Sequence, residues 1–207
     1  MSNTAYFEKR IPIMLELGFN ETQLPILKKY IDFLWESNEI LNLISRKMTF
    51  EELIDNHLID CLLPLKNFPT NVENVADYGT GGGLPGILYA IQFPEMKFHL
   101  YEKSNLKCDF LVKCLTFAPN IIVQGDIPSD LPNIDLIIAR AFKPIDVHLD
   151  MSRSYYLKKG KYFLLKARKE KIEEELILAR KRFKDLKVEI IPLKSPVLEV
   201  ERHLVLI

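Results

Sequence analysis

The chain has 207 residues, of which 48% are hydrophobic and 27% charged, and its 28 Lys and Arg balance its 28 Asp and Glu. This composition is typical of a folded globular protein and excludes disordered, collagen-like and disulfide-stapled classes. No apolar run reaches the roughly 18 residues that a membrane-spanning helix needs. Charged residues Glu8, Lys9 and Arg10 stand where a signal peptide would be apolar, so we expect a cytoplasmic protein.

Residues 1–66 are predicted to form a helical N-terminal extension. Apolar residues at Leu24, Leu27, Ile31 and Leu34 recur at helical spacing, and about three such helices fit before the chain turns rich in Pro and Asn. The stretch from Thr49 to Glu52 has the Ser/Thr-x-x-Glu form of a capping box. We expect a second region, 67–207, to follow.

That second region alternates short apolar runs with amphipathic segments, which predicts an α/β fold with a parallel sheet. The expected strands lie near residues 73–78, 97–102, 120–124, 134–139, 161–166, 186–192 and 202–207. The expected helices lie near residues 85–93, 104–117, 144–157 and 169–182. Because no helix separates the last two strands, we expect them to form a hairpin with the last strand antiparallel.

A glycine-rich loop follows the first predicted strand. The segment from Asp77 to Gly86 holds five of the eight glycines in the chain, and Pro85 suits the first turn of the next helix. An ordinary turn between a strand and a helix needs one such glycine rather than five. The pattern therefore predicts a loop that a ligand approaches closely, with Gly79 and Gly81 against the ligand.

The loop alone leaves the cofactor open. Gly81-x-Gly83-x-x-Gly86 also fits the dinucleotide fingerprint, so a nicotinamide-dependent oxidoreductase and a non-catalytic adenine-nucleotide-binding module are alternatives. A dehydrogenase would need a substrate domain, and only a short hairpin follows the fifth strand. Calorimetry with S-adenosylmethionine and with NAD separates the possibilities.

Acidic residues at three successive strand ends favour S-adenosylmethionine, which has a sulfonium and no phosphate. Asp77 would repel a pyrophosphate but attract a cationic ligand end. Glu102 is within reach of ribose hydroxyls, and Asp126 with the backbone of Gly125 can bind an adenine edge.

Several motifs together resemble the bacterial small-subunit rRNA (guanine-N7) methyltransferase family, also called glucose-inhibited division protein B. They are Asn42-Leu43, His57-x-x-Asp60, Gly79-Thr-Gly-Gly-Gly-Leu-Pro-Gly86, Ala139-Arg-Ala-Phe142, Lys166 and Glu201-Arg-His-Leu-Val205. The resemblance implies a Rossmann-like class I methyltransferase fold with a helical N-terminal extension. It also implies S-adenosylmethionine as cofactor and a guanine N7 of 16S rRNA as target, in free RNA, the 30S subunit or an assembly intermediate.

The resemblance also implies roles for individual residues. The family's cofactor contacts fall on Gly79, Leu84, Gly125, Asp126 and Arg140, with Glu102 at the ribose position. Where the family carries Arg-x-Glu after the third strand, this chain has Gln124-Gly125-Asp126.

Methyl transfer to guanine N7 uses a lone pair that is already free, so we expect no general base, and no nucleophile triad is visible. Arg140 is the candidate catalytic residue, either orienting the base through O6 or shaping the methionine end of the pocket. His57 and Asp60 are three residues apart on a predicted helix, where they could form a pair near the site or act only structurally. We expect no metal, because no third ligand is visible and the cysteines form no CxxC pair.

Positive charge is concentrated late in the chain. Residues 158–187 hold twelve Lys and Arg against five Asp and Glu, which fits either a solvated helix face or a surface for RNA phosphates. The candidate RNA-binding residues are Lys166, Arg168, Lys169, Arg182 and Arg202.

Overall fold

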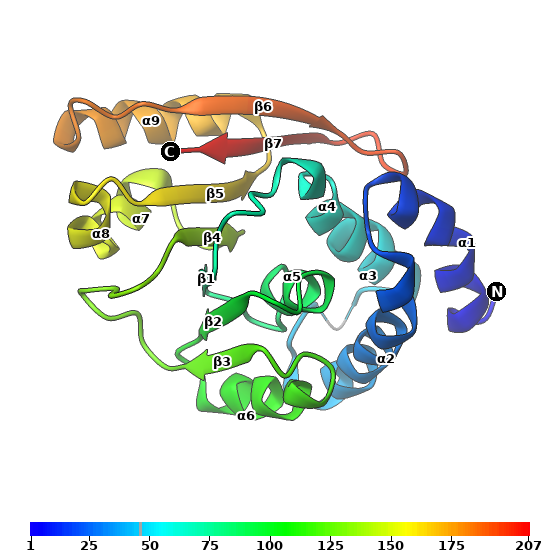
Figure 1. Cartoon of the computed structure of the whole chain (residues 1–207). Helices are drawn as coiled ribbons and strands as arrows, with labels where there is room; N and C mark the ends of the chain where they lie inside the picture. Colours follow the sequence, from blue (N-terminus) through cyan, green and yellow to red (C-terminus); the bar gives the residue numbers. More distant parts are fainter. Residues whose placement is uncertain (46) are drawn as a thin grey trace.

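The computed structural model describes residues 1–45 and 47–207, and it contains a seven-stranded sheet (Figure 1). The strand order is β3-β2-β1-β4-β5-β7-β6. The strands are β1 (Asn74–Tyr78), β2 (Lys97–Tyr101), β3 (Ile121–Gln124), β4 (Leu136–Arg140), β5 (Lys161–Lys166), β6 (Glu189–Lys194) and β7 (Glu201–Leu206). Neighbouring strands from β3 to β5 are parallel, and β7 is antiparallel to both β5 and β6, which confirms the predicted sheet.

Helices cover both faces of this sheet. They are α1 (Asn3–Glu16), α2 (Leu24–Leu41), α3 (Phe50–Leu53), α4 (Ile59–Leu62), α5 (Gly86–Gln92), α6 (Asn105–Lys113), α7 (Ile145–Met151), α8 (Arg153–Leu157) and α9 (Lys169–Arg182). Helices α1 to α4 lie to the right of the sheet in Figure 1, and α7 to α9 lie to its left. Within the described part of the chain, no helix has the length and apolarity needed to cross a membrane.

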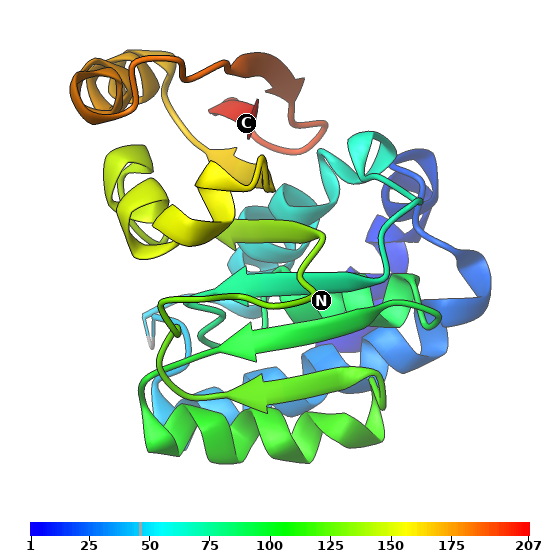
Figure 2. The ribbon, with the colours of Figure 1, turned by 60° about the vertical axis from the view of Figure 1, so that its left-hand side comes forward.

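Successive side chains along a strand point to opposite faces of the sheet and pack into two different hydrophobic clusters. Along β4, Leu136 and Ile138 enter the cluster on the side of α1 to α6, whereas Ile137 and Ala139 enter the cluster on the side of α7 to α9. A strand that is buried on both faces has a continuous apolar run in its sequence, which is typical of strands in parallel sheets. Figure 2 shows β1 to β4 side by side with their arrowheads at one end, so the residues that follow them meet at one edge.

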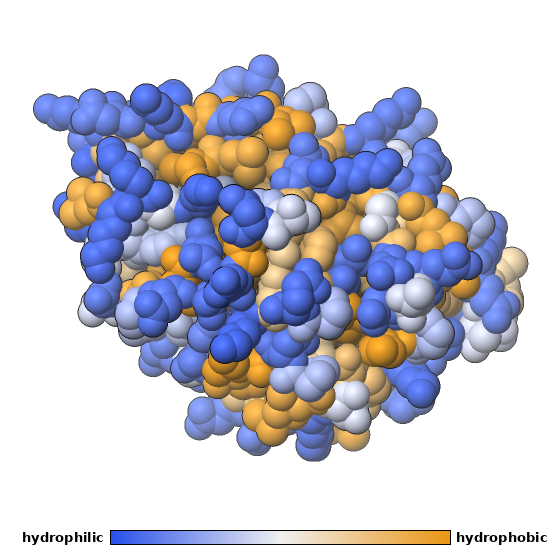
Figure 3. All heavy atoms as spheres, in the orientation of Figure 1, coloured by the Kyte–Doolittle hydropathy of each residue, from blue (hydrophilic) through white to orange (hydrophobic). Residues whose placement is uncertain are grey.

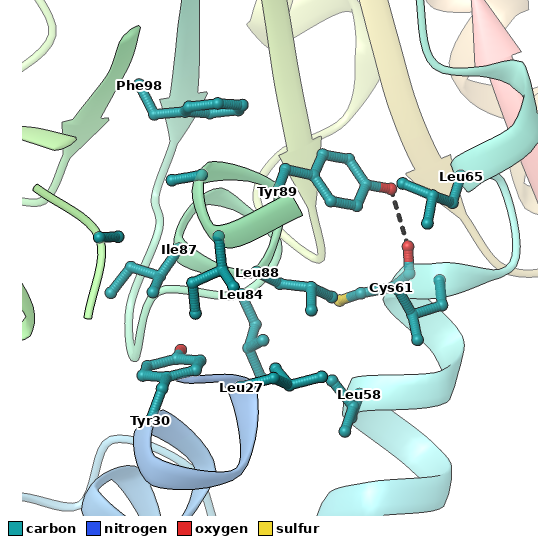
Figure 4. Packing of buried hydrophobic residues seen from close by; sticks show 14 of the residues in the cluster. Leu27, Tyr30, Leu58, Cys61, Leu65, Leu84, Ile87, Leu88, Tyr89 and Phe98 are labelled. Atoms are coloured by element: carbon teal, nitrogen blue, oxygen red, sulfur yellow. Dashed lines mark hydrogen bonds between the residues drawn. The ribbon is translucent and has the colours of Figure 1, made fainter. Parts of the chain in front are cut away.

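The N-terminal extension shares its core with the sheet. Its cluster runs from Phe7 in α1 to Leu204 in β7, and it includes the residues drawn in Figure 4. In that view Tyr89 of α5 donates a hydrogen bond of 2.7 Å to the carbonyl of Cys61 in α4. The capping box is confirmed, because Thr49 accepts from the backbone of Glu52 and Glu52 accepts from that of Thr49. The core is therefore continuous across the predicted boundary at residue 66.

Three predicted helices differ from the observed ones. The helix expected at 144–157 is broken at Ser152. The hydroxyl of Ser152 donates to the carbonyl of His148 and also hydrogen-bonds the hydroxyl of Tyr162, and such bonds from a serine to its own helix disturb the helix. The helix expected at 104–117 ends at Lys113 and continues as a tighter turn. Pro85 lies just before α5 rather than in its first turn.

The third N-terminal helix is also irregular. Residues Ile54–Leu58, between α3 and α4, form a single wider π-helical turn. Such turns are rare and occur frequently at functional sites. This one carries His57, which the sequence had singled out.

Candidate active site

The candidate residues follow successive strands of the sheet. The glycine loop follows β1, Glu102 follows β2, and Gly125 and Asp126 follow β3, while Arg140 ends β4 and Lys166 ends β5. Because these five strands are parallel, all these positions lie at the same edge. Strand β1 pairs with β2 on one side and β4 on the other, and ligands of open α/β sheets bind where the strand order reverses in this way.

The glycine loop requires its glycines for two different reasons. Gly79 has a φ of +68°, and a Cβ atom there would lie 2.2 Å from the ring of Phe142. Gly81 has a φ of +59° but free space around it, so only its backbone conformation disfavours a side chain. The backbone N–H of Gly81 donates to a carboxylate oxygen of Glu102 at 3.2 Å. This hydrogen bond ties the loop to the end of β2.

The carboxylate of Asp77 is hydrogen-bonded within the protein itself. Its side chain is fully buried, and its Oδ2 accepts the backbone N–H of Gly86 at 3.0 Å. Burial raises the pKa of Asp77 to about 6. Its Oδ1 and the hydroxyl of Thr80 are both buried and have no further partner among the described residues, and the Thr80 hydroxyl lowers the pKa of Asp77, as a hydrogen bond to this carboxylate does. The attraction of a cationic ligand end to Asp77 stays a prediction.

Leu84 lies within the hydrophobic core. Its side chain is 6% exposed, and Figure 4 shows it between α5 and the residues Leu27 and Tyr30 of α2. The cofactor contact implied for Leu84 stays a prediction, and its side chain holds the loop against α2.

The two remaining acids differ in their contacts. The Glu102 carboxylate accepts from the backbone N–H groups of Gly81 and Ser104, so its orientation is fixed. Gly125 and Asp126 are exposed, and nothing lies within 4 Å of a Cβ atom placed on Gly125. The edge of the sheet beyond β3 is therefore accessible, as the predicted adenine position requires.

Arg140 is surrounded by partners from distant parts of the chain. Its side chain continues the alternation of β4 toward α4, where one terminal nitrogen donates to His57 Nδ1 at 2.8 Å and the other lies 3.5 Å from Asp60. Asp60 also accepts from Nε of Arg202 in β7 at 2.5 Å. Burial lowers the pKa of His57 to about 4, with the neighbouring arginines adding to the effect, so this ring is neutral near pH 7. The next residue, Ala141, has a φ of +52°, a conformation that non-glycine residues adopt at a cost and that clusters at functional sites.

A cavity of about 660 Å³ opens beside Arg140. Its lining carries six Lys and Arg against two acids; the cationic residues are Arg140, Lys143, Lys166, Arg168, Lys171 and Arg202. Both acids are already paired, since Asp60 binds Arg140 and Arg202 while Glu175 binds Lys166 at 2.8 Å. The rest of the wall is mostly apolar, including Phe142, Leu165 and Val200, and it also contains Asn56, His57 and His203. A ligand that carries negative charge and apolar surface suits such a lining.

The candidate RNA-binding residues separate into two groups. Lys166, Arg168 and Arg202 line the cavity, and Arg168 makes no ion pair within the described residues. Lys169 and Arg182 lie at opposite ends of α9, about 20 Å apart at 1.5 Å per residue. They pair with Glu173 and Asp150 respectively. Figure 3 shows hydrophilic residues over much of one face, with hydrophobic residues between them near β6 and β7.

Sequence reasoning left some cavity residues unassigned. Glu175 and His203 were not singled out individually, and Phe142 was named only within a motif. His203 pairs with Lys166 across β5 and β7, a pairing that only the structure reveals, and its ring Nδ1 is hydrogen-bonded to the carbonyl of Ala167. In the described chain, no group of three or more His, Cys, Asp or Glu side chains could hold a metal ion.

Known proteins resemble this chain over almost its whole length. The family model described as rRNA small subunit methyltransferase G matches residues 23–205. A Bdellovibrio bacteriovorus protein named "Ribosomal RNA small subunit methyltransferase G 1" is 66% identical, covering 98% of this chain and 98% of its own. A Brachyspira hyodysenteriae protein named "Ribosomal RNA small subunit methyltransferase G" is 35% identical, covering 92% of this chain and 93% of its own.

Solved structures with low sequence identity share the fold. A precorrin-6y C5,15-methyltransferase from Geobacter metallireducens has a TM-score of 0.54 at 13% identity, covering 79% of this chain and 90% of its own. A SAM dependent methyltransferase from Aquifex aeolicus has a TM-score of 0.53 at 14% identity, covering 75% of this chain and 91% of its own. The fold is thus the Rossmann-like methyltransferase fold, and by its family match and its relatives the chain belongs to the rRNA small subunit methyltransferase G family.

Proposed function

We propose that the chain transfers the methyl group of S-adenosylmethionine to N7 of a guanine in 16S rRNA. Family membership makes it an S-adenosylmethionine-dependent rRNA methyltransferase, and this decides against the oxidoreductase and the non-catalytic nucleotide-binding module. One observation carries the assignment to this site. Arg140 ends the strand next to the glycine loop and also lines the cationic cavity, which supports a role for it between the cofactor and the substrate.

The residues at the ends of β1 to β3 fit this cofactor. Asp77 Oδ1 and Thr80 Oγ1 are buried polar atoms with no partner beyond each other among the described residues, Glu102 is fixed beside Gly81, and Gly125 borders open space. We infer that Glu102 binds the ribose and that Gly125 with Asp126 binds the adenine. S-adenosylmethionine, when bound, supplies an electrophilic methyl group on a sulfonium.

The cavity suits the target nucleotide. Enzymes that act on a nucleic-acid base take it out of its stack into a pocket, which reads the base by stacking and hydrogen bonds. Here Phe142 and Leu165 offer apolar surface, while Arg168 and Lys143 offer cationic groups for the adjoining phosphates. We infer that Arg140, which lines this cavity, donates to guanine O6, the acceptor beside N7 on the same edge of the base.

The chain's contribution to catalysis is orientation. N7 carries a free lone pair, so no residue has to remove a proton before the methyl group is transferred. The two histidines of the cavity have other contacts, since His57 accepts from Arg140 and His203 binds the carbonyl of Ala167. A residue that aligns the base acts at the transition state and affects turnover more than cofactor binding.

The substrate is rRNA, and we infer 16S rRNA either free or assembled into a 30S subunit or its precursor. An enzyme for this substrate works where ribosomes are made, so we place it in the cytoplasm.

Transfer of tritium from labelled S-adenosylmethionine tests the proposal. Digested 16S rRNA should contain labelled 7-methylguanosine, and free rRNA and 30S subunits are compared as substrates. Arg140→Ala should lower kcat more than it weakens cofactor binding measured by calorimetry. Label at an exocyclic nitrogen or a ribose hydroxyl would overturn the proposed chemistry, and an unchanged kcat would remove Arg140 from it.

A further inference from the structure

The irregular helix formed by α3, the π-helical turn and α4 faces the active site with two polar side chains. His57 and Asp60 are three residues apart and therefore share a face of this helix. Both contact the guanidinium of Arg140, across 83 residues of sequence in the case of His57. The N-terminal extension thus reaches the reacting end of β4.

Asp60 joins two arginines from different strands. It lies 3.5 Å from Arg140 of β4 and 2.5 Å from Arg202 of β7, and its side chain is 10% exposed. Two guanidinium groups on one cavity wall repel each other, and a carboxylate between them offsets that repulsion. Without Asp60, Arg140 would keep only its contact with His57, and Arg202 only its hydrogen bond to the carbonyl of Glu201, among the described residues.

His57 holds the other side of the same guanidinium. Its Nδ1 accepts a hydrogen bond from Arg140, which requires the neutral ring with its proton on Nε2. With one terminal nitrogen near Asp60 and the other bound to His57, rotation of the Arg140 guanidinium is restricted. Its Nε is buried and lacks a partner among the described residues, so these two contacts carry the orientation.

The opposite face of the same helix is anchored separately. Asp55 accepts two hydrogen bonds from Arg10 of α1, at 2.6 and 2.7 Å, and one of 2.7 Å from the hydroxyl of Tyr6. These contacts fix the π-helical turn against α1 without touching Arg140. The helix therefore has a structural aspartate on one face and an aspartate directed at the site on the other.

We propose that Asp60 and His57 are positioning residues, which hold Arg140 in the orientation that aligns the target guanine, and that Asp60 also directs Arg202 into the same cavity. This inference rests on the proposed function, because it names what orients the base-aligning residue. It makes the N-terminal extension part of the catalytic site.

The test compares two aspartates of the same helix. Asp60→Asn and Asp55→Asn each replace a buried, arginine-paired carboxylate by its neutral isostere. We expect Asp60→Asn to lower kcat for rRNA methylation at least tenfold while the Kd for S-adenosylmethionine stays within threefold of wild type. Asp55→Asn should lower the melting temperature and leave the kcat of the folded enzyme within twofold of wild type. Equal kcat losses in both variants would overturn the proposal.

His57 gives an independent test if Asp60→Asn does not fold. His57→Gln keeps an acceptor that can reach Arg140, whereas His57→Leu removes it. We expect kcat within fivefold of wild type for the first and a loss of more than tenfold for the second. Equal turnover by these two variants would overturn the positioning role.

The wild-type enzyme keeps the two levels of the argument apart. If wild type forms no 7-methylguanosine, the proposed function fails. If wild type forms it and the Asp60 and His57 variants match their controls, only the positioning inference fails.

Discussion

Tyr30 of α2 donates a hydrogen bond of 2.7 Å to the carbonyl oxygen of Gly82, so the N-terminal extension binds the glycine loop directly. Tyr30 is fully buried, and Leu34 and Leu43 lie against Gly82 as well. The loop that is expected to hold the cofactor is therefore supported from behind by helices that precede the sheet in sequence.

Tyr30→Phe should destabilise the protein and loosen this loop. The substitution leaves a buried carbonyl without its donor, which costs about 1–3 kcal/mol. Urea denaturation measures the loss in free energy of unfolding, and calorimetry measures the accompanying loss of affinity for S-adenosylmethionine. Unchanged affinity would show that the loop keeps its shape without α2.

Gly79→Ala and Gly125→Ala form a matched pair. At Gly79 the new methyl group meets Phe142 and the left-handed backbone costs a further 1–2 kcal/mol or so, so we expect clear destabilisation and loss of cofactor binding. At Gly125 there is open space, so stability should stay within about 0.5 kcal/mol of wild type. If Gly125→Ala nevertheless weakens cofactor binding, the cofactor approaches that backbone closely.

Glu102→Ala and Asp126→Ala should each weaken binding of S-adenosylmethionine by about 1–3 kcal/mol, because each leaves a ligand hydrogen-bonding group unpaired. Asp126 is exposed, so its variant should fold normally. Leu84→Ala is the contrast, since truncating a buried leucine costs about 2–5 kcal/mol of stability and should cost less cofactor affinity. Wild-type affinity in all three variants would place the cofactor elsewhere.

Stability should fall as the pH drops below 6.5, and His148 should contribute strongly. Burial lowers the pKa of His148 to about 3, so between pH 6.5 and 3 the unfolded chain binds a proton that the folded chain does not. The free energy of unfolding then decreases by about 1.4 kcal/mol per pH unit for this residue. Asp77, whose pKa burial raises to about 6, acts in the opposite direction between pH 6 and 3.8.

Denaturation of wild type and of His148→Gln at pH 7.5 and pH 5 measures the contribution of His148. The variant should lose about 2 kcal/mol less between these two pH values. Equal losses would mean that the imidazole of His148 is not held neutral by burial.

Arg168→Ala should weaken RNA binding more than Arg182→Ala. Arg168 lines the cavity and is free of ion pairs within the described chain, whereas Arg182 lies at the far end of α9 and pairs with Asp150. Loss of one phosphate contact should also lower the slope of log K against log salt by about 1. Filter binding to 16S rRNA over a range of salt concentrations measures both effects. Equal losses of RNA affinity in the two variants would mean that the RNA-binding surface extends along the whole of α9.

The sequence by itself determined the order of the elements and the nature of the loop. Short apolar runs and helical spacing are properties of short segments, and the five clustered glycines indicate locally that the backbone is approached closely. The parallel arrangement then placed Glu102, Asp126 and Arg140 at one edge, because successive parallel strands end together. The combined motifs were specific enough to indicate the family, which the comparisons confirmed.

Only the tertiary structure decided which side chains meet. Strand alternation could direct Arg140 toward one face of the sheet, but its partners His57 and Asp60 depend on how the N-terminal helices pack there. Asp60 and Arg202 are 142 residues apart, and no local pattern links them. The burial of Leu84 and the pairing of Arg182 with Asp150 were hidden for the same reason. Local pattern fixes the backbone, whereas the partners of a side chain follow from packing between distant elements.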